Sequence, residues 1–160
     1  MTEKLSREDF IQIIRNTPLI SIDIIVEDPE GEILLGWRNN SPAKGYWFVP
    51  GGRILKGEHF EDAFKRIVKA ETGMDFSLSD TVFLGIYEHV YPDENFAGDP
   101  SFGTHYIVIA YRLKLTESPG DLPKDQHTDY WWATLDDLLE DPNVHENTRN
   151  YFNGTPSFAE

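Results

Sequence analysis

The stretch from Gly52 to Met74, GRILKGEHFEDAFKRIVKAETGM, decides the fold of this chain. Residues 60–72 carry apolar side chains at helical spacing, and the glycine that follows is suited to end a helix. On a helix, four residues fall on one stripe within about 60°: Phe60, Phe64, Ile67 and Glu71. A carboxylate on an apolar stripe is costly unless it is paired or binds a metal. Glu71 is therefore either a metal ligand or, more simply, a last-turn glutamate that reaches water or pairs with an arginine.

The residues around this helix predict a mixture of strands and helices. Residues 6–16 predict an opening helix that Ser6 caps and Pro18 ends. Residues 19–26 alternate with the period of a strand, with Ile20, Ile22, Ile24 and Val26 on one face. Further strands are expected at 33–38, 46–49, 81–91, 104–115 and 129–134, and short helices at 135–140 and 145–152. Because regular βαβ repetition is missing, we expect an α/β or α+β fold with a mixed sheet.

The overall charge and composition narrow the possible partners. The 160 residues carry a net charge of −14, and a field of that sign repels nucleic acids and anionic membranes. A small anionic substrate is still compatible, since local arginines and a divalent cation override the global charge. The apolar runs are far shorter than the roughly 20 residues that span a bilayer, and the N-terminus lacks the apolar core of a signal peptide. With no cysteine in the chain, we expect a cytoplasmic protein.

The 52–74 stretch resembles the Nudix box, which reads Gly, five residues, Glu, seven residues, Arg-Glu-aliphatic-x-Glu-Glu-x-Gly-aliphatic. The positions that match in register are Gly52, Glu58, Arg66, Val68, Glu71, Gly73 and Met74. The resemblance implies a Nudix hydrolase: one domain over residues 1–160, with a curved mixed sheet sandwiched between helices and a divalent-cation site.

Two positions depart from this pattern. Ile67 and Ala70 stand where the family usually has glutamates that cluster carboxylates around several cations. One remaining helix carboxylate predicts fewer ions, and we expect one Mg²⁺ per subunit, with Mn²⁺ as a possible substitute. Backbone carbonyls, neutral side chains, water and substrate phosphates suit the octahedral oxygen preference of Mg²⁺.

Other segments resemble the GDP-mannose mannosyl hydrolases of this family, notably GYWFVPGGR at 45–53, THY at 104–106 and DQH at 125–127. That resemblance implies hydrolysis of GDP-mannose, and of GDP-glucose as well, to GDP and free hexose by water attack at the sugar C1 with inversion. It also implies a homodimer and a small nucleotide-sugar substrate, while the negative charge predicts no nucleic acid or membrane partner.

The same resemblance implies a role for ten residues. The metal would be held by the Gly51 carbonyl, Glu71 and Gln126, and His127 would be the general base. Arg38 and Arg53 would contact the diphosphate, and Asp23 and Tyr106 would assist the leaving group and the sugar. Phe10 and Leu5 would lie near the guanine.

Simpler interpretations remain open for several of these residues. His127 also fits a surface loop histidine, Arg38 a surface charge, and Phe10 the apolar side of the opening helix. Glu58 and Arg66 are suited to brace the loop and helix rather than bind metal. At the level of function, the alternatives are a Nudix pyrophosphatase that yields a nucleoside monophosphate and a sugar-1-phosphate, and a nucleotide-sugar sensor without turnover.

Overall fold

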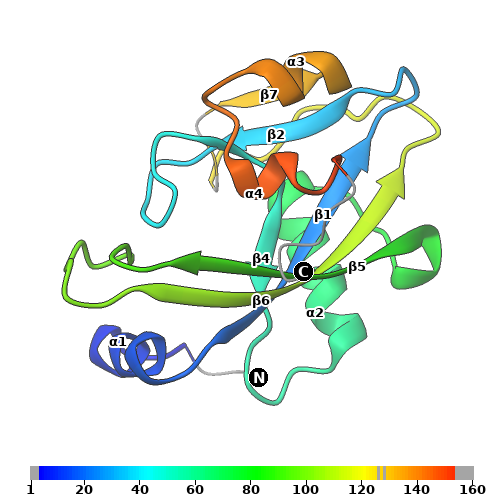
Figure 1. Ribbon diagram of the computed structural model, residues 1–160. Coiled ribbons are helices and arrows are strands. Elements are labelled where there is room, and N and C mark those ends of the chain that lie inside the picture. The colour runs from blue at the N-terminus through cyan, green and yellow to red at the C-terminus, as the bar shows by residue number, and fades with distance from the viewer. Residues whose placement is uncertain (1–3, 126, 128, 154–160) are drawn as a thin grey trace.

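The computed structural model describes residues 4–125, 127 and 129–153, which form a mixed sheet with helices on both of its faces (Figure 1). This arrangement confirms the predicted fold class. The elements in chain order are α1 (Arg7–Asn16), β1 (Leu19–Glu27), β2 (Ile33–Trp37), β3 (Trp47–Phe48), β4 (Gly51–Arg53), α2 (Phe60–Thr72), the 3-10 helix η1 (Leu78–Asp80), β5 (Thr81–Tyr91), β6 (Thr104–Lys114), β7 (Tyr130–Ala133), α3 (Leu135–Glu140) and α4 (Glu146–Arg149).

Strand β1 is the centre of the sheet. It runs parallel to β6 along its full length, and β6 forms a long antiparallel hairpin with β5. On its other edge β1 changes partner: Ser21–Asp23 pair with β4, whereas Glu27 pairs with β2. The remaining strands, β3 and β7, both pair with β2. The edge of β1 is therefore shared between two antiparallel partners, β4 near its start and β2 at its end.

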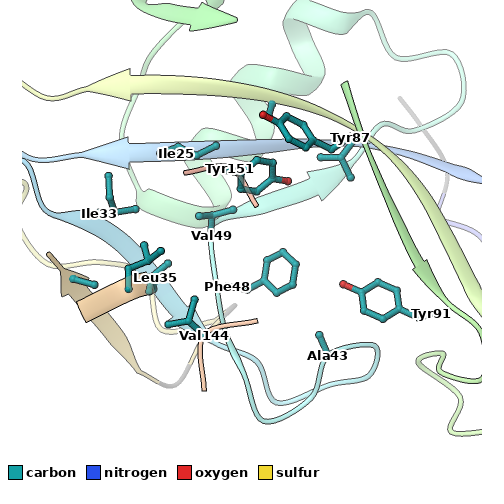
Figure 2. Close-up of a cluster of buried hydrophobic side chains, with 14 residues drawn as sticks. Ile25, Ile33, Leu35, Ala43, Phe48, Val49, Tyr87, Tyr91, Val144 and Tyr151 are labelled. Carbon is teal, nitrogen blue, oxygen red and sulfur yellow. The ribbon is translucent and has the colours of Figure 1, made fainter. Parts of the chain in front are cut away.

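The two faces of β1 contribute to two separate apolar cores. Ile22, Ile24 and Val26 pack with Phe64 and other residues of α2. On the opposite face, Ile25 joins a second cluster that includes Phe48, Tyr87 and Tyr151 (Figure 2). The predicted period of two is thus confirmed, and both faces are covered, which explains why β1 is apolar over so much of its length.

Helix α2 has the predicted bounds and the predicted end. Gly73 caps the C-terminal end of the helix and adopts the left-handed conformation with φ 74°. Ile67, on the apolar stripe of α2, is buried and packs against β4. A Cβ added to Gly52 would lie 3.1 Å from Cγ1 of Ile67. Gly52 therefore permits the close approach of α2 to the sheet.

Two elements were not predicted, β4 and η1. The sequence Gly51-Gly52-Arg53 has none of the β-branched or aromatic residues that favour strands, and β4 exists because its backbone pairs with β1. Helix α4 is also shorter than the predicted 145–152. Among the described residues, no helix has the length and apolar character needed to cross a bilayer.

Candidate active site

A cavity of about 290 Å³ lies beside the part of β1 where its pairing changes from β4 to β2. It is lined by eight of the ten residues predicted for the site: Phe10, Asp23, Arg38, Gly51, Arg53, Glu71, Tyr106 and His127. Leu5 lies before α1, 40% exposed, and is not among the lining residues, so the structure does not bring it to the cavity. The predicted ligand Gln126 lies outside the described residues.

Glu71 and His127 form a buried pair in the lining of the cavity. Nε2 of the imidazole lies 2.8 Å from Oε2 of Glu71, and both side chains are less than 10% exposed. Nδ1 of the same ring lies 3.3 Å from the carbonyl oxygen of Trp37. The interpretation of His127 as a surface histidine is therefore wrong. The simpler interpretation of Glu71 is wrong as well, because its partner is a buried histidine rather than water or an arginine.

Two glycines make room for the polar side chains of the site. A Cβ on Gly36 of β2 would lie 2.6 Å from both Cγ and Nδ1 of His127. A Cβ on Gly51 would collide with Oδ1 of Asp23, its partner across β1 and β4. Such distances are closer than side chains tolerate, so the two positions require glycine for close approach. Gly51 makes room for Asp23 and Gly52 makes room for Ile67 of α2, which accounts for the Gly-Gly pair.

Asp23 is a buried carboxyl group that projects from β1 into the cavity. Tyr151, from the segment after α4, donates its hydroxyl to Oδ2 of Asp23. Burial raises the pKa of Asp23 to about 7, while the Tyr151 hydrogen bond and the charge of Arg38 act in the opposite direction. The carboxyl group therefore takes up and releases its proton near neutral pH.

The positive charge of the cavity comes from two arginines. Nε of Arg38 donates to the carbonyl of Pro42 at 2.9 Å, which holds the side chain along the loop after β2. The guanidinium of Arg53 lies over the ring of Phe10, 4.0 Å from its centroid, and burial lowers its pKa. Since the whole chain is acidic, Arg38 and Arg53 provide the local attraction for an anionic ligand.

The ring of Phe10 is shared between α1 and the cavity. Besides Arg53 it contacts Phe96 of the loop 92–103, with ring centroids 5.0 Å apart. Phe10 is only partly buried, and it packs against the small cluster of Ile14, Leu19 and Phe102. Both interpretations of Phe10 are thus compatible with its position, because one side of the ring packs and another faces the cavity.

Glu58 and Arg66 brace the loop before α2. Nε of Arg66 lies 2.6 Å from Oε1 of Glu58, and the other oxygen of Glu58 accepts from the backbone of Leu55 at 3.0 Å. A second guanidinium nitrogen of Arg66 donates to the Arg53 carbonyl at 2.9 Å. Neither residue lines the cavity. They fix the backbone that presents Arg53.

The oxygen donors of the cavity suit a hard cation with few protein ligands. Glu71 and Gly51 both line it, whereas Ile67 is buried in the core and Ala70 is exposed at the helix surface. Within the described ranges, no cluster of three or more His, Asp or Glu side chains could enclose a metal ion. One carboxylate and a backbone carbonyl fit Mg²⁺, which retains several waters and is often completed by substrate phosphates.

Several further lining residues were given no site role from the sequence. They are Ser21, Asn39, Asn40, Pro42, Phe48, Val49, Gly52, His89 and Tyr91. His89 is the most informative, because it is buried beside Tyr151, and burial together with nearby His145 lowers its pKa to about 3. The signal in the sequence was its place on a predicted strand beside the loop 92–103, whereas its register opposite Tyr106 came only from the structure.

The fold and the cavity now define a class of protein. Residues 17–153 match the NUDIX domain family, so the chain belongs to the Nudix family and is a hydrolase of that family. Nudix hydrolases generally use a divalent metal such as Mg²⁺ and act on small-molecule substrates such as nucleotide derivatives.

Individual relatives show the range within this family. The chain is 36% identical over 116 residues to the low-salt glycan biosynthesis protein Agl8 of Haloferax volcanii. The aligned region covers 72% of this chain and 71% of that protein. The chain is 37% identical over 96 residues to an ADP-ribose pyrophosphatase of Methanocaldococcus jannaschii, covering 60% and 50% respectively. Among solved structures, the MutT protein of Methanosarcina mazei superposes with a TM-score of 0.67 at 22% identity, over 87% of this chain and 94% of that one. That last likeness concerns the fold.

Proposed function

We propose that this protein hydrolyses GDP-mannose, and GDP-glucose as well, to GDP and free hexose. The observation that carries the proposal is the cavity-facing side of α2, which offers one carboxylate, Glu71, next to a buried histidine. The two positions at which the family usually adds carboxylates are a core residue, Ile67, and an exposed one, Ala70. Such a site is poorly suited to clustering several cations around a phosphorus centre.

Attack by water at the sugar C1 needs fewer metal ions than attack at phosphorus. Water forms a bond to C1 as the bond between C1 and the β-phosphate oxygen breaks, and GDP leaves with the electron pair. The charge that develops on GDP would be stabilised by Arg38 and Arg53, which line the cavity together. A bound Mg²⁺ would add to this stabilisation, with Glu71, the Gly51 carbonyl and Gln126 as its protein ligands. Because GDP is a good leaving group, no strong acid is required.

His127 is proposed to take the proton from the attacking water. Its Nδ1 is oriented by the Trp37 carbonyl, which leaves Nε2 as the atom that accepts. In the described arrangement Nε2 faces Oε2 of Glu71. When Glu71 serves as a metal ligand, that place becomes available to a water. Attack from the face opposite the departing GDP inverts C1, as in inverting glycosidases.

The second candidate is a pyrophosphatase that yields a nucleoside monophosphate and a sugar-1-phosphate. Similarity to the ADP-ribose pyrophosphatase of M. jannaschii favours it. The two reactions differ in the atom that water attacks, and turnover of GDP-mannose with Mg²⁺ in ¹⁸O-labelled water separates them. We expect the label in free mannose and none in GDP. Label in GMP or mannose-1-phosphate would show attack at phosphorus and reject the proposed function.

We further propose that residues 1–160 form one domain, that the protein works in the cytoplasm and that it functions as a homodimer. Sedimentation equilibrium of the purified chain tests the last point directly, since a monomer at all concentrations would contradict it.

A further inference from the structure

Tyr151 is a buried tyrosine from the end of the chain that reaches the floor of the cavity. It follows α4 and is 8% exposed, and its ring meets that of Tyr87 edge-on at 4.6 Å (Figure 2). Its hydroxyl donates to Oδ2 of Asp23 and lies 3.4 Å from Nε2 of His89. The hydroxyl therefore contacts two side chains that line the cavity, Asp23 and His89. Tyr151 itself is not a lining residue.

The carboxyl group of Asp23 is fixed from two sides. Tyr151 occupies Oδ2, while Oδ1 lies so close to the backbone of Gly51 that a Cβ there would collide with it. A buried carboxyl group without a donor would be free to rotate and costly to bury. Because the Tyr151 hydroxyl holds one oxygen, the Asp23 carboxyl group keeps one orientation. Its remaining acceptor sites therefore point in fixed directions.

We propose that Tyr151 is a positioning residue, whose hydroxyl holds the Asp23 carboxyl in the orientation that receives the sugar of the substrate. This inference rests on the proposed function, in which Asp23 contacts the sugar of a nucleoside-diphosphate hexose. A sugar hydroxyl donates to the carboxyl oxygen that Tyr151 leaves available. Tyr151 touches no substrate and acts only through Asp23.

The packing of Tyr151 and its hydrogen bond can be separated. The ring belongs to the apolar cluster around Phe48 and Tyr87, and a phenylalanine would fill the same space. The hydroxyl adds nothing to that packing, and it contacts Asp23 and His89. Tyr151→Phe therefore removes the positioning contact and keeps the core. Tyr87→Phe is the matched control, because it removes a hydroxyl from the neighbouring ring, outside the cavity lining.

The test is a double-mutant cycle of Tyr151→Phe and Asp23→Asn, measured as kcat and KM for GDP-mannose, with inhibition by GDP as a second readout. We expect Tyr151→Phe to lower kcat/KM by about 10-fold, as loss of one hydrogen bond at a buried carboxyl group does. In the Asp23→Asn background the same change should have less than about a twofold effect, because the group it positions has gone. The inhibition constant of GDP should stay within about twofold in both backgrounds, since GDP lacks the hexose that Asp23 contacts.

Independent effects of the two substitutions, or equal effects of Tyr151→Phe and Tyr87→Phe, would overturn the inference. Should Tyr151→Phe fail to fold, 3-fluorotyrosine at position 151 keeps the ring and makes the hydroxyl a stronger donor. A changed kcat/KM with unchanged GDP inhibition then supports the inference, and an unchanged kcat/KM overturns it. If the wild-type products are GMP and mannose-1-phosphate, the proposed function fails, and the same cycle run on that reaction still decides whether Tyr151 acts through Asp23.

Discussion

Nε2 of His127 lies 2.8 Å from Oε2 of Glu71, although 56 positions separate the two residues in the sequence. The pair joins the last turn of α2 to the segment just before β7. It thereby places the proposed general base next to the proposed metal ligand, in a cavity that also holds two arginines.

His127→Gln tests the general base. Glutamine preserves a polar side chain but cannot accept a proton at neutral pH, so kcat should fall by roughly 10²–10⁴-fold. Steady-state rates with GDP-mannose provide the measurement. His105→Gln is the control, since His105 pairs with Glu88 at 3.0 Å and does not line the cavity. An unchanged rate in His127→Gln would remove this residue from catalysis.

Gly36→Ala tests whether the position of the imidazole matters. The new Cβ would lie 2.6 Å from the ring of His127, so the ring has to leave its position beside Glu71. A displaced base costs about 10²-fold in kcat. At Gly120 a Cβ would meet no atom within 4 Å, so Gly120→Ala should behave as wild type in the same assay. Equal rates in both variants would mean that the His127 position is not critical.

Glu71→Gln tests the metal site. Losing the carboxylate should raise the Mg²⁺ concentration for half-maximal rate by about 10-fold or more. Titration of the rate with Mg²⁺ gives this value. Glu61 lies on the exposed side of the same helix, paired with Lys65 at 3.6 Å, and Glu61→Gln provides the control. The same Mg²⁺ dependence in both variants would exclude Glu71 as a ligand.

Phe10→Ala tests the base-binding prediction. If the ring stacks on the nucleobase, KM for GDP-mannose should rise by about 10-fold with little change in Tm. Ile14→Ala, on the same helix, removes a core residue outside this cavity and should lower Tm without raising KM. A Phe10→Ala variant that loses stability but keeps its KM would assign the ring to the core instead.

Asp23→Asn tests the buried carboxyl group through the pH dependence of stability. Folding raises the Asp23 pKa from 3.8 to about 7, so the folded state binds the proton more tightly. The resulting stabilisation is fully present below the unfolded value and is lost as pH rises through the folded one. Between the two values the wild type should lose up to about 1.4 kcal/mol of unfolding free energy per pH unit from this group.

The asparagine variant lacks this contribution. Its unfolding free energy relative to wild type should therefore increase as pH rises from about 4 to 7. Urea unfolding of both proteins across this range measures the difference. A difference that is constant with pH would show that the carboxyl group titrates alike in the folded and unfolded chain.

Much of the fold followed from local patterns. The bounds of α2, its glycine cap and the strand at 81–91 agree with the sequence predictions, because helical and strand periodicities are written in neighbouring residues. Strand β4 was missed for the same reason: its three residues have no strand pattern, and only pairing with β1 makes them a strand.

The sequence by itself determined that α2 carries one carboxylate on an apolar stripe, since burial of Phe64 and Ile67 carries Glu71 inward with them. Only the tertiary structure decided what that carboxylate meets. His127 reaches Glu71 because Gly36 leaves room for its ring, and Tyr151 reaches Asp23 across 128 positions. These contacts depend on sheet register and on packing between distant segments, and no local period in the chain encodes either of them.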